Sequence, residues 1–338
     1  ILSLFCAAFA SAGDPFTVAG IPVDATGTNA IAAQTQAISE GQALAAQVLI
    51  DRLTLKSERA TKRLEPLDTE TIARMIRALE ISNEKRSASR YLGDITVAFN
   101  PSQVQQVLVS RGLTMISTQS RPRLVLPVLA GQSLWSNNGW NSAFQNPAYG
   151  FSLTPLRGIQ STDGGAAIIN AQQAVNTDMD ALRMIGQRYG VSQVLIATAR
   201  PGPRGVDVSL TDVALDTGQT RNLGRVSALD YHEAAWGVVE TLEDDWKQAS
   251  VSLAENAVTM TVSVLYRSLR EWQNLQDAIN GSAQIQDARL DALSKDGALM
   301  TVTYGGDFER LRNELSFKGV DVRRDPALGV IMTRTGRL

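Results

Sequence analysis

The sequence predicts an α+β protein made of several small modules, and three observations predict it. Apolar residues recur at helical spacing over residues 171–189, and an apolar run at 194–197 and an alternating run at 206–211 follow this helix. Residues 258–333 alternate between strand and helix patterns in the order βαββαβ and end in a hairpin, which is a ferredoxin-like plan. With 338 residues, the chain is long enough for more than one hydrophobic core.

The central stretch predicts a helix packed on an antiparallel sheet. Gly190 follows the last apolar residue of the helix, where a left-handed backbone conformation ends many helices. The run at 194–197 has no polar alternation, which predicts a strand covered on both faces. Turns at residues 201–205 and 216–218 separate it from the alternating strand and from a returning strand that ends at Val226. This order argues against a nucleotide-binding βαβ fold.

The N-terminal region predicts an α+β module of its own. Asn100 and Pro101 open one of its helices as the N-cap and the first-turn proline, with Gln103 as a capping-box partner. In chain order, the expected elements are a strand at 16–23, helices at 30–55 and 69–82 joined by a charged linker at 56–63, a strand at 91–99, a helix that ends at Gly112, and an apolar strand at 124–129.

Element order and composition give the domain boundaries. Asp230 and Glu233 fit a capping box that starts a helix reaching about residue 247, and this helix would connect the last two modules. The predicted division is a truncated signal peptide at 1–12, an N-terminal α+β module at 13–120, a central α+β module at 121–228, a connecting helix at 229–255 and the ferredoxin-like module at 256–338.

The first twelve residues are apolar and end in Ala10-Ser11-Ala12, which is an A-x-A cleavage pattern. They start without Met or a basic segment, so we interpret them as a truncated signal peptide, with a short buried helix as the alternative. Cys6 follows the bulky Phe5, which argues against lipidation. We therefore expect a periplasmic protein, secreted through a cleaved N-terminal signal peptide. The apolar run is too short to span a bilayer, so we expect no integral membrane segment in the mature chain.

Composition excludes several classes of protein. Hydrophobic residues make up 44% of the chain and charged residues 20%, which is typical of a globular protein. The net charge of −2 and the pI near 5.6 argue against nucleic-acid binding, which needs a basic face. The single cysteine excludes an intrachain disulfide framework.

The central stretch also resembles domains of known envelope proteins. Three motifs carry this resemblance: Tyr189-Gly190 before the apolar strand, the run from Val206 to Val213, and Thr217-Gly218. They are similar to small domains of the Tol–Pal translocation protein, the curli secretion lipoprotein and lipoprotein activators of peptidoglycan synthases. Over most of its length, the chain resembles the bacterial secreted family called domain of unknown function 2066, through residues 20–23, 37–53 and 170–175. The resemblance implies an envelope fold and compartment, and it implies no activity.

Residues 132–151 combine aromatic side chains with asparagines. Rings beside amides could stack on and hydrogen-bond to sugar rings or a partner peptide. The alternative is a short helix at 139–145 that folds the aromatic side chains onto the sheet, since buried aromatic residues dominate core energetics. The candidate partner-binding residues are Trp135, Trp140, Phe144 and Tyr149.

No set of residues in the sequence predicts catalysis, a metal site or a cofactor. A catalytic triad or a zinc site would depend on His232, the only histidine, and its place in the first turn of a helix argues against both. The acidic residues 243–245 predict a solvated helix face, because a calcium site needs ligands converging from a loop. Asp212 is expected to order the turn that follows it.

Residues 305–309 resemble the signature of diguanylate cyclases with its last two letters exchanged. The run lies between a predicted strand and a predicted helix, and the other motifs of that fold are missing. We therefore interpret Asp307 as the N-cap of the helix that starts at Phe308.

These inferences favour a non-enzymatic interaction or scaffold protein of the bacterial cell envelope, whose partners are other envelope proteins. Its small modules would present sheet edges and helix faces. The alternative is a protein that binds or hydrolyses an envelope polymer, peptidoglycan or another glycan, with paired carboxylates. A deep cleft with two facing carboxylates would favour the hydrolase, whereas flat modules with an exposed aromatic patch would favour the interaction protein.

Overall fold

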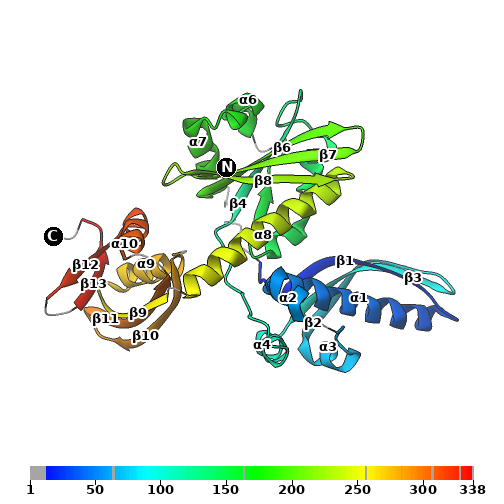
Figure 1. The fold of residues 1–338 in the computed structure, drawn as a ribbon, viewed down its shortest axis with the longest axis horizontal. Helices are drawn as coiled ribbons and strands as arrows, with labels where there is room; N and C mark the ends of the chain where they lie inside the picture. Colours follow the sequence, from blue (N-terminus) through cyan, green and yellow to red (C-terminus); the bar gives the residue numbers. More distant parts are fainter. Residues whose placement is uncertain are drawn as a thin grey trace, which may run out of the picture. The chain divides into compact units, whose positions relative to one another are not determined.

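Three β-sheets and the helices that cover them confirm the predicted α+β class (Figure 1). In this computed structural model, the chain divides into two compact units, residues 1–247 and 248–338. Among the described residues, no helix has both the length and the hydropathy needed to cross a bilayer. The residues that the structure describes are 13–62, 65–162, 164–255, 257–282, 284–305, 308–326 and 329–336, so the predicted signal peptide and Asp307 lie outside them.

The first unit opens with an antiparallel sheet of order β1-β3-β2, formed by β1 (Thr17–Thr26), β2 (Ile76–Arg86) and β3 (Arg90–Phe99). Alternate residues of β3 are buried, and α1 (Ala30–Leu53) packs on β1 and β3. The pairing of β1 with β3 has a register break between Val18 and Ile21. As the strand order shows, β1 lies at the edge of this sheet.

The remaining N-terminal helices differ in part from the prediction. The predicted helix at 69–82 is wrong in its second half, because α3 (Thr69–Met75) ends where β2 begins. The predicted linker at 56–63 contains α2 (Lys56–Lys62). The helix α4 (Pro101–Ser110) confirms the expected N-cap, since the Asn100 side chain accepts from the amides of Ser102 and Gln103.

A second sheet in the first unit has the order β5-β4-β6-β7-β8. The strands β6, β7 and β8 form the predicted antiparallel meander. However, β4 pairs in parallel with both β5 and β6, so the sheet is mixed and not wholly antiparallel as predicted. The reason is topological, because helices carry the chain from β4 back to the same end of the sheet before β6 begins. The strands are β4 (Arg123–Leu129), β5 (Leu156–Gly158), β6 (Gln193–Gly202), β7 (Gly205–Ala214) and β8 (Thr220–Ala228).

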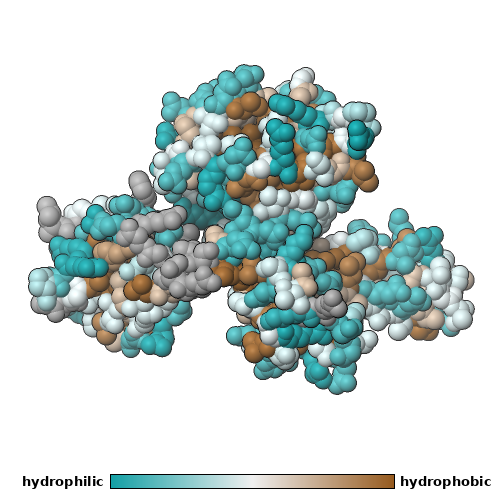
Figure 2. Space-filling model, viewed as in Figure 1, coloured by the Kyte–Doolittle hydropathy of each residue, from teal (hydrophilic) through white to brown (hydrophobic). Residues whose placement is uncertain are grey.

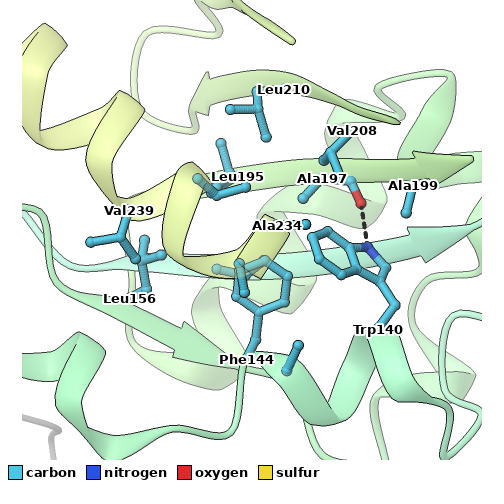
Figure 3. Close-up of a cluster of buried hydrophobic side chains, with 14 of the residues drawn as sticks. Trp140, Phe144, Leu156, Leu195, Ala197, Ala199, Val208, Leu210, Ala234 and Val239 are labelled. Atoms are coloured by element: carbon cyan, nitrogen blue, oxygen red, sulfur yellow. Dashed lines mark hydrogen bonds between the residues drawn. The ribbon is translucent and has the colours of Figure 1, made fainter. Parts of the chain in front are cut away.

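Helices cover both faces of this mixed sheet and form a core on each. One core joins the sheet to α5 (Gly139–Ala143), the 3₁₀ helix η1 (Pro147–Phe151) and the first part of α8 (Tyr231–Glu255). Figure 3 shows Trp140 and Phe144 packed against Leu195, Val208 and Ala234 in this core. The other core lies under the 3₁₀ helix η2 (Gly165–Ala167), α6 (Ala171–Val175) and α7 (Met179–Tyr189).

The predicted helix at 171–189 is two helices. Thr177 has a left-handed φ of 55°, and Asp178 caps α7 by accepting from the amide of Ala181. The predicted end of this region is confirmed, because Gly190 has a φ of 67° and follows the last helical residue. The sequence pattern placed Asp178 on the apolar face of one helix, whereas its carboxylate begins a second one.

The second unit has the predicted order of elements and a five-stranded sheet. Its strand order is β10-β11-β9-β13-β12, and β13 runs parallel to β9. In this order β13, the second strand of the predicted final hairpin, lies between β9 and β12. The two helices and the sheet share a core that includes Trp272, Met300 and Leu315. The elements are β9 (Ala257–Leu265), α9 (Leu269–Asn280), β10 (Ile285–Leu293), β11 (Gly297–Gly305), α10 (Phe308–Phe317), β12 (Val320–Asp325) and β13 (Gly329–Arg334).

Candidate binding cavity in the first unit

A cavity of about 690 Å³ lies within the first unit, between α8 and the sheet that contains β1. This volume falls in the range of roughly 300–1,000 Å³ that is typical of ligand pockets. The helix α8 forms one wall, the strand β1 with the end of α1 forms the opposite wall, and η1 contributes residues between them. The cavity therefore brings together segments that are far apart in the sequence.

The α8 wall is one face of a helix, because its residues recur three or four positions apart. His232, Trp236, Glu240 and Glu243 line the cavity along this face, and Val239 contributes an apolar surface. Trp236 is 37% exposed, and its indole N–H donates to His232 Nε2 at 3.3 Å. The predicted N-cap is confirmed, since the Glu233 amide donates to Asp230 Oδ1 at 2.8 Å. The reciprocal bond differs from that of a capping box, because Glu233 Oε2 accepts from the amide of Leu229, one residue before the cap, at 2.8 Å.

The opposite wall is a strand edge. Five consecutive residues of β1, Val18–Pro22, line the cavity at the point where the pairing with β3 is interrupted. Gly20 has a φ of 71°, a left-handed conformation that favours glycine, and the space beside its Cα is open. The register break thus gives the cavity a wall of exposed main chain.

A buried arginine and a buried glutamate tie these walls to the rest of the unit. Arg52 donates through Nη1 to the carbonyl oxygens of Pro15 at 2.8 Å and Thr17 at 2.7 Å. Burial lowers the pKa of the Arg52 guanidinium, while the carboxylates of Glu243 and Asp14 act in the opposite direction. These bonds hold the end of α1 against the start of β1.

Glu243 corrects the prediction of a solvated acidic face at residues 243–245. Its side chain is buried, and Oε1 accepts from Ser152 Oγ at 2.7 Å and from the Leu153 amide at 3.0 Å. Burial of a carboxylate is tolerated here because hydrogen bonds satisfy it. Asp244 and Asp245 are half-buried and form ion pairs, Asp244 with Lys247 and Asp245 with Arg221.

Most of the other charged side chains of the cavity also have partners within the chain. Arg59 and Asp51 form an ion pair at 2.8 Å. Lys247 is buried, donates through Nζ to the Asp51 carbonyl oxygen at 3.1 Å, and pairs with Asp244 at the same distance. For Glu240 and Lys56, the structure records no ion pair or side-chain hydrogen bond within its described residues.

An aromatic pair lies between the two walls. The rings of Tyr149 and Trp236 meet edge to face, with centroids 4.9 Å apart and an interplanar angle of 80°. The Tyr149 hydroxyl is buried, and it has no hydrogen-bond partner in the described part of the chain. Burial raises the pKa of this hydroxyl to about 12. An unsatisfied phenol in a cavity lining is a group that a ligand could satisfy.

The four aromatic residues proposed from the sequence as a partner surface are all in the core. Trp140, Phe144 and Tyr149 belong to the core under α8, whereas Trp135 belongs to the core on the other side of the sheet. Their exposed fractions are 0%, 3%, 1% and 8% in that order. The Trp140 indole N–H donates to the Ala197 carbonyl oxygen at 3.0 Å, the dashed bond in Figure 3. They pack on the sheet and form no exposed patch, although Tyr149 also lines the cavity.

Asp212 has a different role from the predicted one. Its carboxylate pairs with the Arg123 guanidinium, with Nε to Oδ1 at 3.0 Å and Nη2 to Oδ2 at 3.2 Å, and both residues are buried. The turn after β7 instead contains Asp216, which pairs with Arg121 at 2.8 Å. Asp212 therefore fixes β7 to β4 across the sheet.

The sequence indicated the aromatic segment and the lone histidine, and it missed Trp236, Glu240 and Glu243 as residues of one surface. Their spacing on α8 was the available signal. Among the described residues, no group of three or more histidine, cysteine, aspartate or glutamate side chains is arranged to hold a metal ion. No family model, curated protein or solved structure matches the chain.

Proposed function

We propose that the chain is a non-enzymatic interaction protein of the bacterial cell envelope, which binds other envelope proteins through the cavity of its first unit. The observation that supports this proposal is the character of the lining. Its charged side chains are mostly held by partners within the chain, and the rest of the lining includes a strand edge and the exposed ring of Trp236, which meets the buried ring of Tyr149. Such groups bind a partner and do not in themselves carry out a reaction.

The envelope compartment is part of this proposal and depends on the sequence alone. Ala10-Ser11-Ala12 supports cleavage after an apolar segment, and the resemblance to the secreted family described above points to the same compartment. N-terminal sequencing of protein from a periplasmic extract tests it. We expect a start near Gly13.

Site-specific crosslinking tests the proposed interaction. A photoreactive amino acid at His232, which is exposed and lines the cavity, should capture envelope proteins in intact cells. The same group at Arg204, an exposed residue of the first unit outside the cavity, is the matched control. Equal adducts from both positions would contradict binding through the cavity, and adducts from neither would contradict the interaction itself.

One observation favours the alternative, a protein that binds or hydrolyses an envelope polymer. The cavity carries carboxylates on both walls, with Asp51 on one and Glu240 and Glu243 on the other, beside the rings of Tyr149 and Trp236. Rings and carboxylates together suit a sugar ring. Release of soluble fragments from purified peptidoglycan, abolished by Glu240→Gln, would support the hydrolase.

A further inference from the structure

The β1 wall of the cavity is suited to pairing with another extended chain. Among the described strands, β1 pairs only with β3, so its other edge presents main-chain groups along Val18–Pro22, where those residues line the cavity. Pro22 removes one donor from this edge, and the register break before Ile21 leaves Ala19 and Gly20 outside the ladder with β3. A short extended peptide can add to such an edge through its main chain.

The α8 wall is suited to a positive charge. Glu240 lies one helical turn after Trp236, and the ring of Trp236 meets that of Tyr149. Indole and phenol faces attract a guanidinium or an ammonium group, and a nearby carboxylate adds to the attraction. Because the indole N–H is taken by His232, the face of the ring is what Trp236 offers to a ligand.

The charge of the whole lining agrees with a basic ligand. Five carboxylates line the cavity, and four arginine or lysine side chains oppose them. Three of the four basic groups are held within the chain: Arg52 by two carbonyl oxygens, Arg59 by Asp51 and Lys247 by Asp244. The fourth basic group, Lys56, and the carboxylates of Asp94 and Glu240 remain, so the lining keeps a surplus of one carboxylate, with Glu240 on the α8 wall.

We propose that the cavity binds an extended peptide segment of a partner protein, which pairs with β1 and places a lysine or arginine side chain against Trp236, Tyr149 and Glu240. This inference rests on the proposed function and adds the chemistry of the partner to it. A sugar polymer would use the rings but not the strand edge, so the edge distinguishes the two ligands.

A peptide probe tests the strand pairing without altering the protein. The probe is a fluorescent peptide that alternates valine and threonine around a central lysine, titrated with the full chain and followed by anisotropy. Two derivatives carry N-methyl groups on alternate residues, which removes the N–H donors from one edge of the peptide or from the other. We expect one derivative to lose affinity by about tenfold or more and the other to bind as the parent does.

Variants of the protein test the charged contact. Glu240→Gln should weaken the lysine peptide by about tenfold and leave a peptide with norleucine at the same place unaffected. The matched control is Glu80→Gln, which changes an exposed glutamate on β2 outside the cavity and should leave both affinities as they are.

The outcomes separate this inference from the proposed function. Equal effects of the two methylation patterns, or equal binding of the lysine peptide and a matched glutamate peptide, would overturn the inference. So would binding of a chito-oligosaccharide with no binding of the peptides, or no binding of any probe. If crosslinks from His232 persist in these cases, the interaction function stands and only the peptide chemistry is lost.

Discussion

The buried pair of Arg123 and Asp212 is the residue-scale feature with the clearest consequence for stability. Both side chains are less than 10% exposed, and each has two bonds to the other. Asp212→Asn would leave the guanidinium buried without a charged partner. Breaking such a pair costs about 3–5 kcal/mol, so we expect the free energy of unfolding to fall by this amount in urea titrations.

Asp216→Asn is the matched control for that measurement. This substitution breaks the ion pair with Arg121, in which the Arg121 side chain is 23% exposed and the Asp216 side chain 27% exposed. Because the pair is partly solvated, its loss should change the free energy of unfolding by about 1 kcal/mol or less. Two variants of similar effect would show that burial does not govern the strength of these pairs. In that case the role assigned to Asp212 in fixing β7 to β4 would be wrong.

Tyr149 gives a prediction on pH dependence. The pKa of its hydroxyl is raised from 10.0 to about 12, so the unfolded chain ionises before the folded one. The unfolded state therefore binds fewer protons between these values, and stability should fall as the pH rises from 10 towards 12. Tyr149→Phe should lose this contribution, and at neutral pH it should change stability by about 1 kcal/mol or less because the hydroxyl has no partner to lose. If the stability of Tyr149→Phe fell between pH 10 and pH 12 as steeply as that of the parent, the assignment of this pH dependence to the Tyr149 hydroxyl would be wrong.

The candidate cavity could be predicted from the sequence only as single residues and not as a site. The sequence identified Tyr149 as an aromatic residue of interest, but the cavity also needs β1 and α1 on one side and α8, which follows them by more than a hundred residues, on the other. Glu243 looked solvated because neighbouring acids usually are, and only the fold reveals Ser152 and Leu153 as its donors. Spacing along one helix cannot show what another segment brings to it.

At the scale of elements, the break between α6 and α7 leads to a prediction on Asp178. Hydrogen bonds from the Ala181 amide and from the Gln173 side chain lower the pKa of this carboxylate below 3.8. Its contribution to stability is present above the unfolded pKa and is lost as the pH falls through the folded one. Asp178→Asn keeps the cap, so at neutral pH its unfolding temperature should be close to that of the parent, while Asp178→Ala should unfold at a lower temperature. Below pH 4, the unfolding temperature of the parent should approach that of the Ala variant. A difference between the two temperatures that does not change with pH would contradict this prediction.

Element types were predictable from the sequence where local signals agreed with the fold. The caps at Asn100, Asp230 and Gly190 are short-range chemistry, and all three are where the sequence placed them. The strand β2 was predicted as a helix because its apolar residues fit both periods, and its pairing with β3 decides between them. Pairing is a long-range interaction, so propensity could not reveal it.

At the scale of the whole molecule, each unit has a core of its own. The second unit buries Trp272, Leu275 and Met300 between its helices and sheet, while the first has a core on each face of its mixed sheet. The sequence predicted the α+β class and a last module that begins at residue 256 after a connecting helix, whereas the two compact units divide between residues 247 and 248, inside α8. It did not predict that the regions 13–120 and 121–228 belong to a single unit, because the bonds that connect them through α8 are tertiary: Glu243 accepts from Ser152, and Lys247 donates to the Asp51 carbonyl oxygen.

Separate cores predict separate unfolding. Calorimetry of the full chain should show two transitions, since compact units with their own cores tend to unfold cooperatively and one by one. Leu195→Ala opens a cavity in the first unit and Leu315→Ala one in the second, where both side chains are fully buried. Each should cost about 2–5 kcal/mol in its own unit and lower one transition only. The two variants serve as controls for each other, because a shift of both transitions by either substitution would mean that the two cores unfold together.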